Sequence, residues 1–137
     1  MKKANVIILL VASLALAACT QTKEDMLIGT WHLDRAVETV TGSGYQTDSE
    51  LPGYDDYTMD FVKEGYCAVT VRGTCTIYMW YLVGDNTLLL ELDNDIEDYT
   101  IVELTRKRLV YSDTYSVRDT ATDGITFYTY TFEYSKQ

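Results

Sequence analysis

Few side chains in this chain of 137 residues have the types and spacing that catalysis requires. His32, the only histidine, stands two residues before Asp34, and such a pair together with a serine would resemble a hydrolytic triad. The sequence contains no G-x-S-x-G motif to present that serine, and residues 42–44 (Gly-Ser-Gly) are typical of a flexible loop. We therefore predict no catalytic residues and no enzyme activity.

Acidic residues cluster at residues 93–98, where the sequence DNDIED resembles the start of a calcium-binding loop. Such a loop needs glycine at its sixth position and glutamate at its twelfth, and these positions hold Asp98 and Leu104. Asp55 and Asp56 form a shorter acidic pair with no further ligand nearby. With one histidine and no clustered thiols, a zinc site is not expected either. We predict no metal and no cofactor.

Cys67 and Cys75 flank a predicted hairpin turn at Arg72-Gly73. A two-residue turn places Cys67 opposite Tyr78, which separates the two thiols along the ladder. A bulge or a longer loop would bring them together. The sequence therefore leaves two alternatives open, a Cys67–Cys75 disulfide and two free thiols, and the lack of a Cys-x-x-Cys motif argues against redox catalysis.

The third cysteine, Cys19, follows a leader with a basic start at Lys2 and Lys3 and an apolar stretch from Val6 to Ala18. That stretch is shorter than the roughly 20 residues that a membrane-spanning helix needs. The junction Leu16-Ala17-Ala18-Cys19 resembles the lipobox of bacterial lipoproteins. The resemblance implies cleavage before Cys19, a lipid on its thiol and an acylated (for example palmitate-bearing) new amino terminus; the alternative is an ordinary signal peptide.

We accordingly divide the chain into a signal peptide (1–18), a lipidated tether (19–25) and one domain (26–137). Thr20, after the cysteine, resembles the enterobacterial pattern that favours the outer membrane. Residues 23–25 (Lys-Glu-Asp) are similar to acidic tags that send lipoproteins to the cell surface, although they also suit a solvated tether. We predict a lipid-anchored outer-membrane protein, on the periplasmic face or at the cell surface.

The composition indicates a globular and acidic domain. Hydrophobic residues make up 47% of the chain and charged residues 23%, and the formal net charge is −10. Affinity for nucleic acid is built from Lys and Arg contacts to phosphate, so nucleic acid is not an expected partner. Docking onto anionic lipid through a basic patch is disfavoured for the same reason.

Eight runs rich in β-branched residues and tyrosine alternate with turn signals, which predicts an all-β domain of eight antiparallel strands. The predicted strands are 26–37, 57–63, 66–72, 74–83, 87–92, 99–104, 108–117 and 125–134. Sequential hairpins form a meander, and closure of a meander into a barrel removes its exposed edges. Between the first two strands we expect a long irregular segment, Thr39–Asp56.

Three motifs together resemble the strands of lipocalins and other calycins. They are the G-x-W opening in Leu27–Leu33, Met59-Asp60-Phe61 followed by Glu64-Gly65, and Tyr99–Thr105 followed by Leu109-Val110-Tyr111. The resemblance implies an eight-stranded up-and-down barrel in which Gly29 allows a tight bend and Trp31 plugs the closed end. The chain departs from the pattern because it has no helix after the last strand, no clear T-D-Y turn and no sure match for the arginine that covers the tryptophan.

The family resemblance and the twelve tyrosines favour non-catalytic binding of a small, partly apolar molecule at the open end of the barrel. The predicted wall residues are Met59, Trp80, Tyr128, Tyr130 and Phe132. The alternative is a protein-interaction module, an accessory subunit or an enzyme inhibitor, whose barrel is filled by side chains. A pocket of a few hundred Å³ in the barrel interior would favour the first, and an interior filled by side chains would favour the second.

Overall fold

The structure is a computed structural model that describes residues 21–137. The predicted leader and Cys19 lie outside the described residues. The elements are α2 (Lys23–Leu27), β1 (Gly29–Gly42), β2 (Tyr45–Glu50), β3 (Tyr57–Phe61), β4 (Tyr66–Val71), β5 (Thr74–Val83), β6 (Thr87–Leu92), β7 (Asp95–Leu104), β8 (Arg108–Arg118) and β9 (Ile125–Lys136).

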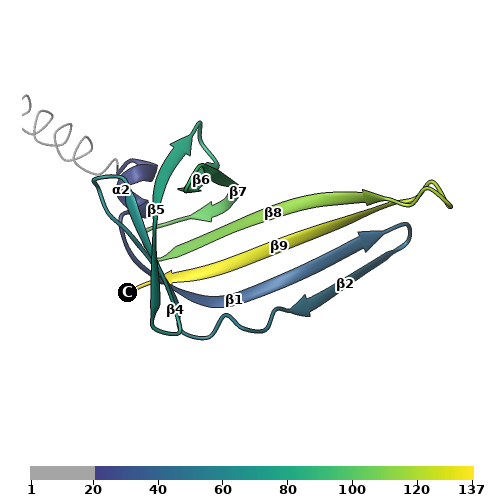
Figure 1. The fold of residues 1–137 in the computed structure, drawn as a ribbon, viewed down its shortest axis with the longest axis horizontal. Coiled ribbons are helices and arrows are strands. Elements are labelled where there is room, and N and C mark those ends of the chain that lie inside the picture. The colour runs from purple at the N-terminus through teal and green to yellow at the C-terminus, as the bar shows by residue number, and fades with distance from the viewer. Residues whose placement is uncertain (1–20) are drawn as a thin grey trace, which may run out of the picture.

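The strands pair in the order β2-β1-β3-β4-β5-β6-β7-β8-β9, all antiparallel, and β9 pairs back onto β1. Strands β1 and β3 to β9 therefore close an eight-stranded barrel (Figure 1). This confirms the predicted all-β meander without a C-terminal helix, and the architecture is compatible with a calycin fold. The short α2 is the only helix among residues 21–137.

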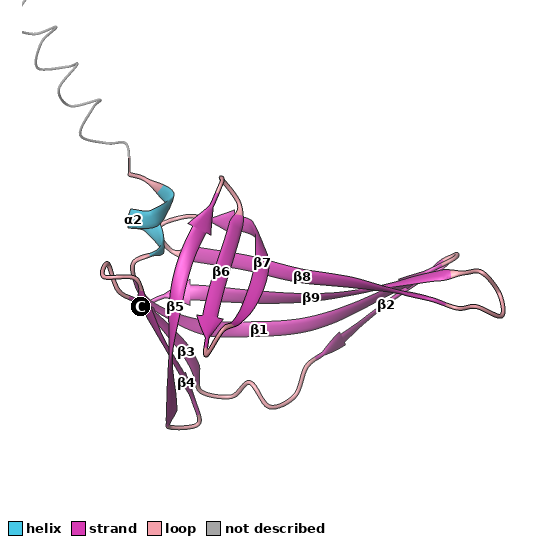
Figure 2. Cartoon of the chain, turned by 45° about the horizontal axis from the view of Figure 1, so that its top comes forward, coloured by secondary structure: helices cyan, strands magenta, loops and turns pink. Residues whose placement is uncertain are grey.

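A four-stranded sheet, which we call the arm, extends beyond the barrel (Figure 2). It consists of β2, residues 37–42 of β1, residues 112–118 of β8 and residues 125–131 of β9. The prediction of an irregular segment over Thr39–Asp56 was wrong for most of its length. Residues 39–42 continue β1 against β9 and residues 45–50 form β2, because Gly44, at φ +80°, allows a tight reversal between them.

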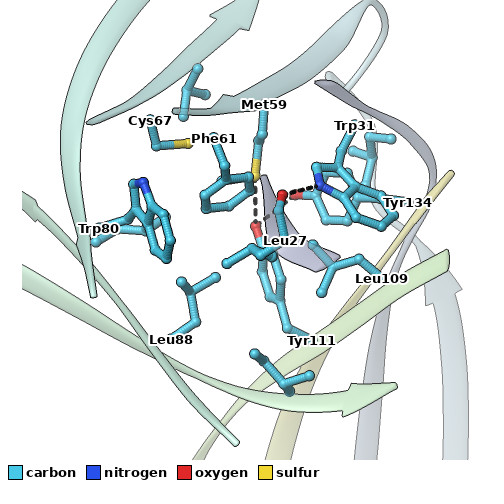
Figure 3. Packing of buried hydrophobic residues seen from close by; sticks show 14 of the residues in the cluster. Leu27, Trp31, Met59, Phe61, Cys67, Trp80, Leu88, Leu109, Tyr111 and Tyr134 are labelled. Atoms are coloured by element: carbon cyan, nitrogen blue, oxygen red, sulfur yellow. Dashed lines mark hydrogen bonds between the residues drawn. The ribbon is translucent and has the colours of Figure 1, made fainter. Parts of the chain in front are cut away.

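Large side chains fill the interior of the barrel (Figure 3). The predicted alternation is confirmed, because Met59 and Phe61 are buried on either side of exposed Asp60. Leu88 and Leu90 are buried in the same way on β6. Tyr111 and Tyr134 lie in the centre of this core, almost without solvent exposure. The barrel below its open end is thus filled by side chains, which is the arrangement expected of the protein-interaction alternative and not of a hollow ligand-binding barrel.

The helix α2 covers one end of the barrel, which we call the closed end. Thr22 caps the helix by accepting a hydrogen bond from the Asp25 amide at 3.1 Å, so part of the predicted tether is helical. The buried Leu27 accepts a hydrogen bond at 2.7 Å from the indole of Trp31, which is also fully buried. Lys23 donates to the carbonyl of Asp85 in the β5–β6 turn, which fixes the helix to the barrel.

A lysine covers Trp31, where the family pattern has an arginine. Lys136 Nζ lies 5.0 Å from the centroid of the Trp31 ring and donates to the carbonyl of Met26 at 2.8 Å. Gly29 has a φ of +127°, and a Cβ atom there would stand 2.7 Å from Lys136 Cε. Glycine at position 29 therefore permits both the backbone conformation and the approach of the lysine.

The two cysteines of the described chain are free thiols on opposite faces of the sheet. Arg72 and Gly73 both have positive φ and make the two-residue turn, so Cys67 pairs with Tyr78 as predicted. Cys67 points into the core and Cys75 is exposed, and the disulfide alternative is therefore not supported. Burial raises the pKa of the Cys67 thiol to about 12.

Candidate ligand-binding site

The five predicted wall residues divide between the core, the open end and the arm. Met59 and Trp80 lie in the packed core, where Met59 Sδ accepts a hydrogen bond from the Tyr111 hydroxyl at 3.5 Å. The Trp80 indole donates to the carbonyl of Val62 at 3.0 Å and its ring meets Phe61 edge to face. Neither side chain faces the pocket described next.

A pocket of about 230 Å³ lies at the open end of the barrel, opposite α2. It is lined by Tyr54, Tyr99, Asp113, Tyr130 and Phe132. Tyr54 comes from the segment that leads into β3, Tyr99 from β7, Asp113 from β8, and the last two residues from β9. Asp113 and Tyr130 stand directly opposite each other across the β8–β9 ladder, so their side chains share one face of the sheet.

The aromatic rings of this pocket lie in different planes. The Tyr54 ring is inclined at 67° to the Phe132 ring, with the two centroids 5.6 Å apart. The Tyr99 ring is inclined at 84° to the same ring at 6.4 Å. Phe132 therefore meets two tyrosines near a right angle, and the three rings form a concave aromatic surface rather than a single stack.

The third predicted residue of β9, Tyr128, lies on the same face but farther out on the arm. Its ring stacks on that of Tyr115, with centroids 4.9 Å apart and planes only 8° from parallel. Tyr115 also lies against Tyr130, and the two hydroxyl oxygens are 3.5 Å apart. A row of tyrosines thus continues the inner face of the barrel from the pocket onto the arm.

The surroundings of Tyr99 and Tyr130 in the pocket raise the pKa of both hydroxyls. The Tyr99 hydroxyl donates to Glu97 Oε2 at 2.8 Å, and burial together with this hydrogen bond raises the pKa of Tyr99. Hydrogen bonds with Tyr115 and Glu38 raise the pKa of Tyr130. No lysine or arginine lines the pocket. The site therefore offers aromatic faces, neutral hydroxyls and carboxylates.

The residues that suggested hydrolytic chemistry do not form a triad. His32 Nδ1 lies 3.8 Å from Asp34 Oδ1, and the Ser135 hydroxyl donates to that same carboxylate oxygen at 3.0 Å instead of to the imidazole. These side chains are on the exposed outer face of the barrel. Across residues 21–137, no group of three or more His, Cys, Asp or Glu side chains is arranged to hold a metal ion.

The acidic segment at residues 93–98 is a hairpin in the structure. Asp93 and Asn94, both with positive φ, make the turn, and residues 95–98 belong to β7. The backbone of this segment is therefore committed to the strand ladder with β6.

Several other hollows lie on the outside of the protein. One of about 260 Å³ lies under residues 50–55 and includes the ion pair between Arg35 and Glu50, whose atoms are 2.7 Å apart. A second, of about 310 Å³, lies over the outer face of β5 near Tyr66 and Met79. The second hollow also places two tyrosines, Tyr66 and Tyr78, beside Glu91 and Asp93, whereas the pocket at the open end has three aromatic rings in contact through Phe132.

The structure adds Tyr54, Tyr99 and Asp113 to the residues predicted from the sequence. The alternation with buried Ile101 and Tyr111 places Tyr99 and Asp113 on inner faces, so strand periodicity carried a signal for these two. Tyr54 belongs to an irregular segment after Pro52-Gly53, and no sequence pattern indicated the direction in which its side chain points. Comparison of the chain with protein-family models and with curated proteins gives no match.

Proposed function

We propose that this chain is a membrane-anchored, non-catalytic binding protein of lipocalin-like type, which holds a small, partly apolar ligand at the open end of its barrel. The observation that carries the proposal is the concave aromatic pocket formed by Tyr54, Tyr99 and Phe132. Ligand sites are typically concave and largely apolar, with a few polar groups that orient the ligand. The packed core beneath makes the pocket shallow and its base rigid, so the ligand sits at the mouth and not inside the barrel.

The membrane anchor in this proposal is a lipid on Cys19, which precedes α2 by a few residues. Most lysines and arginines of the described chain lie at the closed end, together with Glu24, Asp25, Glu64 and Asp85. These basic residues are Lys23, Lys63, Arg106, Lys107, Arg108 and Lys136. Within residues 21–137 we find no helix with the length and apolarity to cross a bilayer. An anchor at Cys19 would therefore put the closed end near the lipid and leave the pocket facing away from it.

The anchor is tested by the variant Cys19→Ser, expressed in a bacterial host and fractionated. We expect the native chain in the membrane fraction with a mass increased by acyl chains, and the variant uncleaved or soluble. A variant that stays with the membranes and is processed to the same mass would contradict lipidation at Cys19. This outcome would leave the pocket proposal untouched.

The pocket is tested with an uncharged probe, N-phenylnaphthylamine, whose fluorescence rises when it leaves water. We expect saturable binding to the full chain, weakened about three- to tenfold by Tyr99→Ala because one aromatic wall is lost. Tyr128→Ala removes a tyrosine from the arm and serves as the matched control with unchanged affinity. Equal loss in both variants, or no saturable binding, would contradict a site at the mouth.

A second candidate function is the protein-interaction module, and the outer face of β5 favours it. Ile77, Met79, Tyr81 and Val83 point outward in one row and are exposed, and Tyr66 lies beside Met79. The row carries no charge, while Glu91 on β6 borders it. A protein with an apolar patch and a basic rim would fit this face. Met79→Glu would abolish such an association and leave probe binding at the mouth unchanged.

A further inference from the structure

We infer that the ligand held at the open end is an organic cation, an ammonium group that carries apolar substituents. The inference rests on the proposed function, because it names the ligand class of the same pocket. Three features of the pocket lead to it: the orientation of its rings, the carboxylates around it, and the distribution of basic side chains.

The rings can surround a cation from more than one side. The face of an aromatic ring carries negative potential, and cations bind over it within about 6 Å of the centroid. Tyr54 and Tyr99 stand at 67° and 84° to Phe132, so an occupant of the pocket meets rings that lie in different planes. Substituted ammonium groups are bound in aromatic cages of this kind because they are weakly hydrated and polarise the surrounding rings.

Three carboxylates surround these rings. Asp113 lines the pocket directly. Glu97 accepts the hydrogen bond from the Tyr99 hydroxyl, which leaves its other oxygen free. Glu38 on β1 lies opposite Tyr130 in the β1–β9 ladder, and its carboxylate contributes to the raised pKa of that tyrosine. The negative charge thus lies at the rim, where it can attract a cation, while the aromatic rings contact its apolar groups.

None of these three carboxylates is paired with a lysine or arginine in the part of the chain that the structure describes. Elsewhere three arginines do pair with neighbouring carboxylates: Arg35 with Glu50, Arg108 with Glu103 and Glu133, and Arg118 with Asp123. The charge around the pocket therefore remains negative and uncompensated. An anionic ligand such as a fatty acid or a phosphate ester would be repelled there.

The charge is tested with choline and its uncharged carbon isostere, dimethylbutanol, by titrating each into the full chain in non-ionic detergent and following side-chain NMR signals. The two probes have the same shape, so their difference in affinity reports the charge alone. We expect choline to bind about tenfold more tightly than the isostere. Its affinity should fall as ionic strength rises, because salt screens the attraction between the charges. Equal affinities would overturn the cation inference and leave the proposed binding function standing.

Two charge-removing variants locate the effect. Asp113→Asn keeps the shape of the side chain. It should weaken the binding of choline at least about threefold and leave the affinity for the isostere unchanged. Asp48→Asn makes the same change on the opposite face of the arm, where Asp48 pairs with Thr39, and should leave both probes unchanged. Equal effects of the two variants would overturn the assignment of the charge to this pocket. If neither probe binds but N-phenylnaphthylamine does, the cation inference alone fails; if none of the three binds, the proposed function fails as well.

Discussion

The hydroxyl groups of Tyr111 and Tyr134 lie 2.6 Å apart in the centre of the barrel. Tyr111 also donates to Met59 Sδ at 3.5 Å, so Tyr134 can donate to Tyr111 and both hydroxyls have partners. Within the described chain no buried side-chain nitrogen or oxygen lacks a hydrogen bond. This pair occupies the space that would hold a ligand in a hollow barrel, and the Tyr111 ring contacts Tyr99 and Phe132 of the pocket above it.

Removal of one hydroxyl of this pair should destabilise the fold. Tyr134→Phe leaves the Tyr111 hydroxyl in the core with only the thioether of Met59 as partner. We expect a loss of about 1–3 kcal/mol in the free energy of unfolding, measured by urea denaturation. Tyr128→Phe on the arm is the control, with an expected change within about 0.5 kcal/mol. Equal losses in the two variants would show that the hydrogen bond of the buried pair does not contribute to the free energy of unfolding.

The same two tyrosines predict a fall in stability at alkaline pH. Burial raises the pKa of both Tyr111 and Tyr134 well above the ordinary value of 10.0. A raised pKa in the folded state means that the full contribution to stability is present below pH 10 and is lost as the pH rises above it. Above pH 10, each of the two tyrosines then lowers the free energy of unfolding by about 1.4 kcal/mol per pH unit. Urea midpoints that stay constant across that range would contradict burial of the pair.

The contact between Gly29 and Lys136 predicts an unequal effect of two similar substitutions. Gly29→Ala introduces a Cβ atom 2.7 Å from Lys136 Cε at a φ of +127°, whereas Gly65→Ala meets no atom within 4 Å at a φ of +93°. In both variants the backbone conformation lowers the free energy of unfolding by about 1–3 kcal/mol. Only Gly29→Ala also displaces the lysine from Trp31. Thermal denaturation should therefore rank Gly29→Ala as the less stable variant. The reverse order would show that Lys136 adapts freely.

The two thiols of the described chain, Cys67 and Cys75, should differ in reactivity. Cys75 is exposed, whereas Cys67 is buried and its pKa is raised to about 12, so little thiolate forms there at neutral pH. Alkylation followed by mass spectrometry should label Cys75 within minutes and Cys67 only after unfolding. Equal labelling rates in the native protein would place Cys67 at the surface. Protection of both thiols until a reductant is added would indicate a disulfide.

The barrel could be predicted from the sequence because strand periodicity and hairpin turns are local properties. Leu88, Leu90 and the residues around Phe61 alternate clearly, and the Arg72-Gly73 turn fixes the register of Cys67. The arm could not be predicted in the same way. Residues 45–50 (YQTDSE) are exposed on both faces, and they form a strand only because residues 37–42 are already held against β9.

The pocket was only half predicted, because it depends on contacts between distant parts of the chain. Alternation along β9 placed Tyr130 and Phe132 on the inner face. Asp113 joins them through the β8–β9 register, and Tyr54 through the path of an irregular segment. Met59 and Trp80, predicted as wall residues, belong to the core instead, because the sequence cannot show how deeply the barrel is filled.

NMR mapping of assigned side-chain signals during titration with N-phenylnaphthylamine shows whether ligands bind at the mouth above a filled core. We expect shifts concentrated at Tyr54, Tyr99, Tyr130 and Phe132, with the methyl signal of Met59 and the indole signal of Trp80 unchanged. Shifts largest at Met59 and Trp80 would contradict binding at the mouth, because they would reveal a barrel that opens and takes the ligand inside.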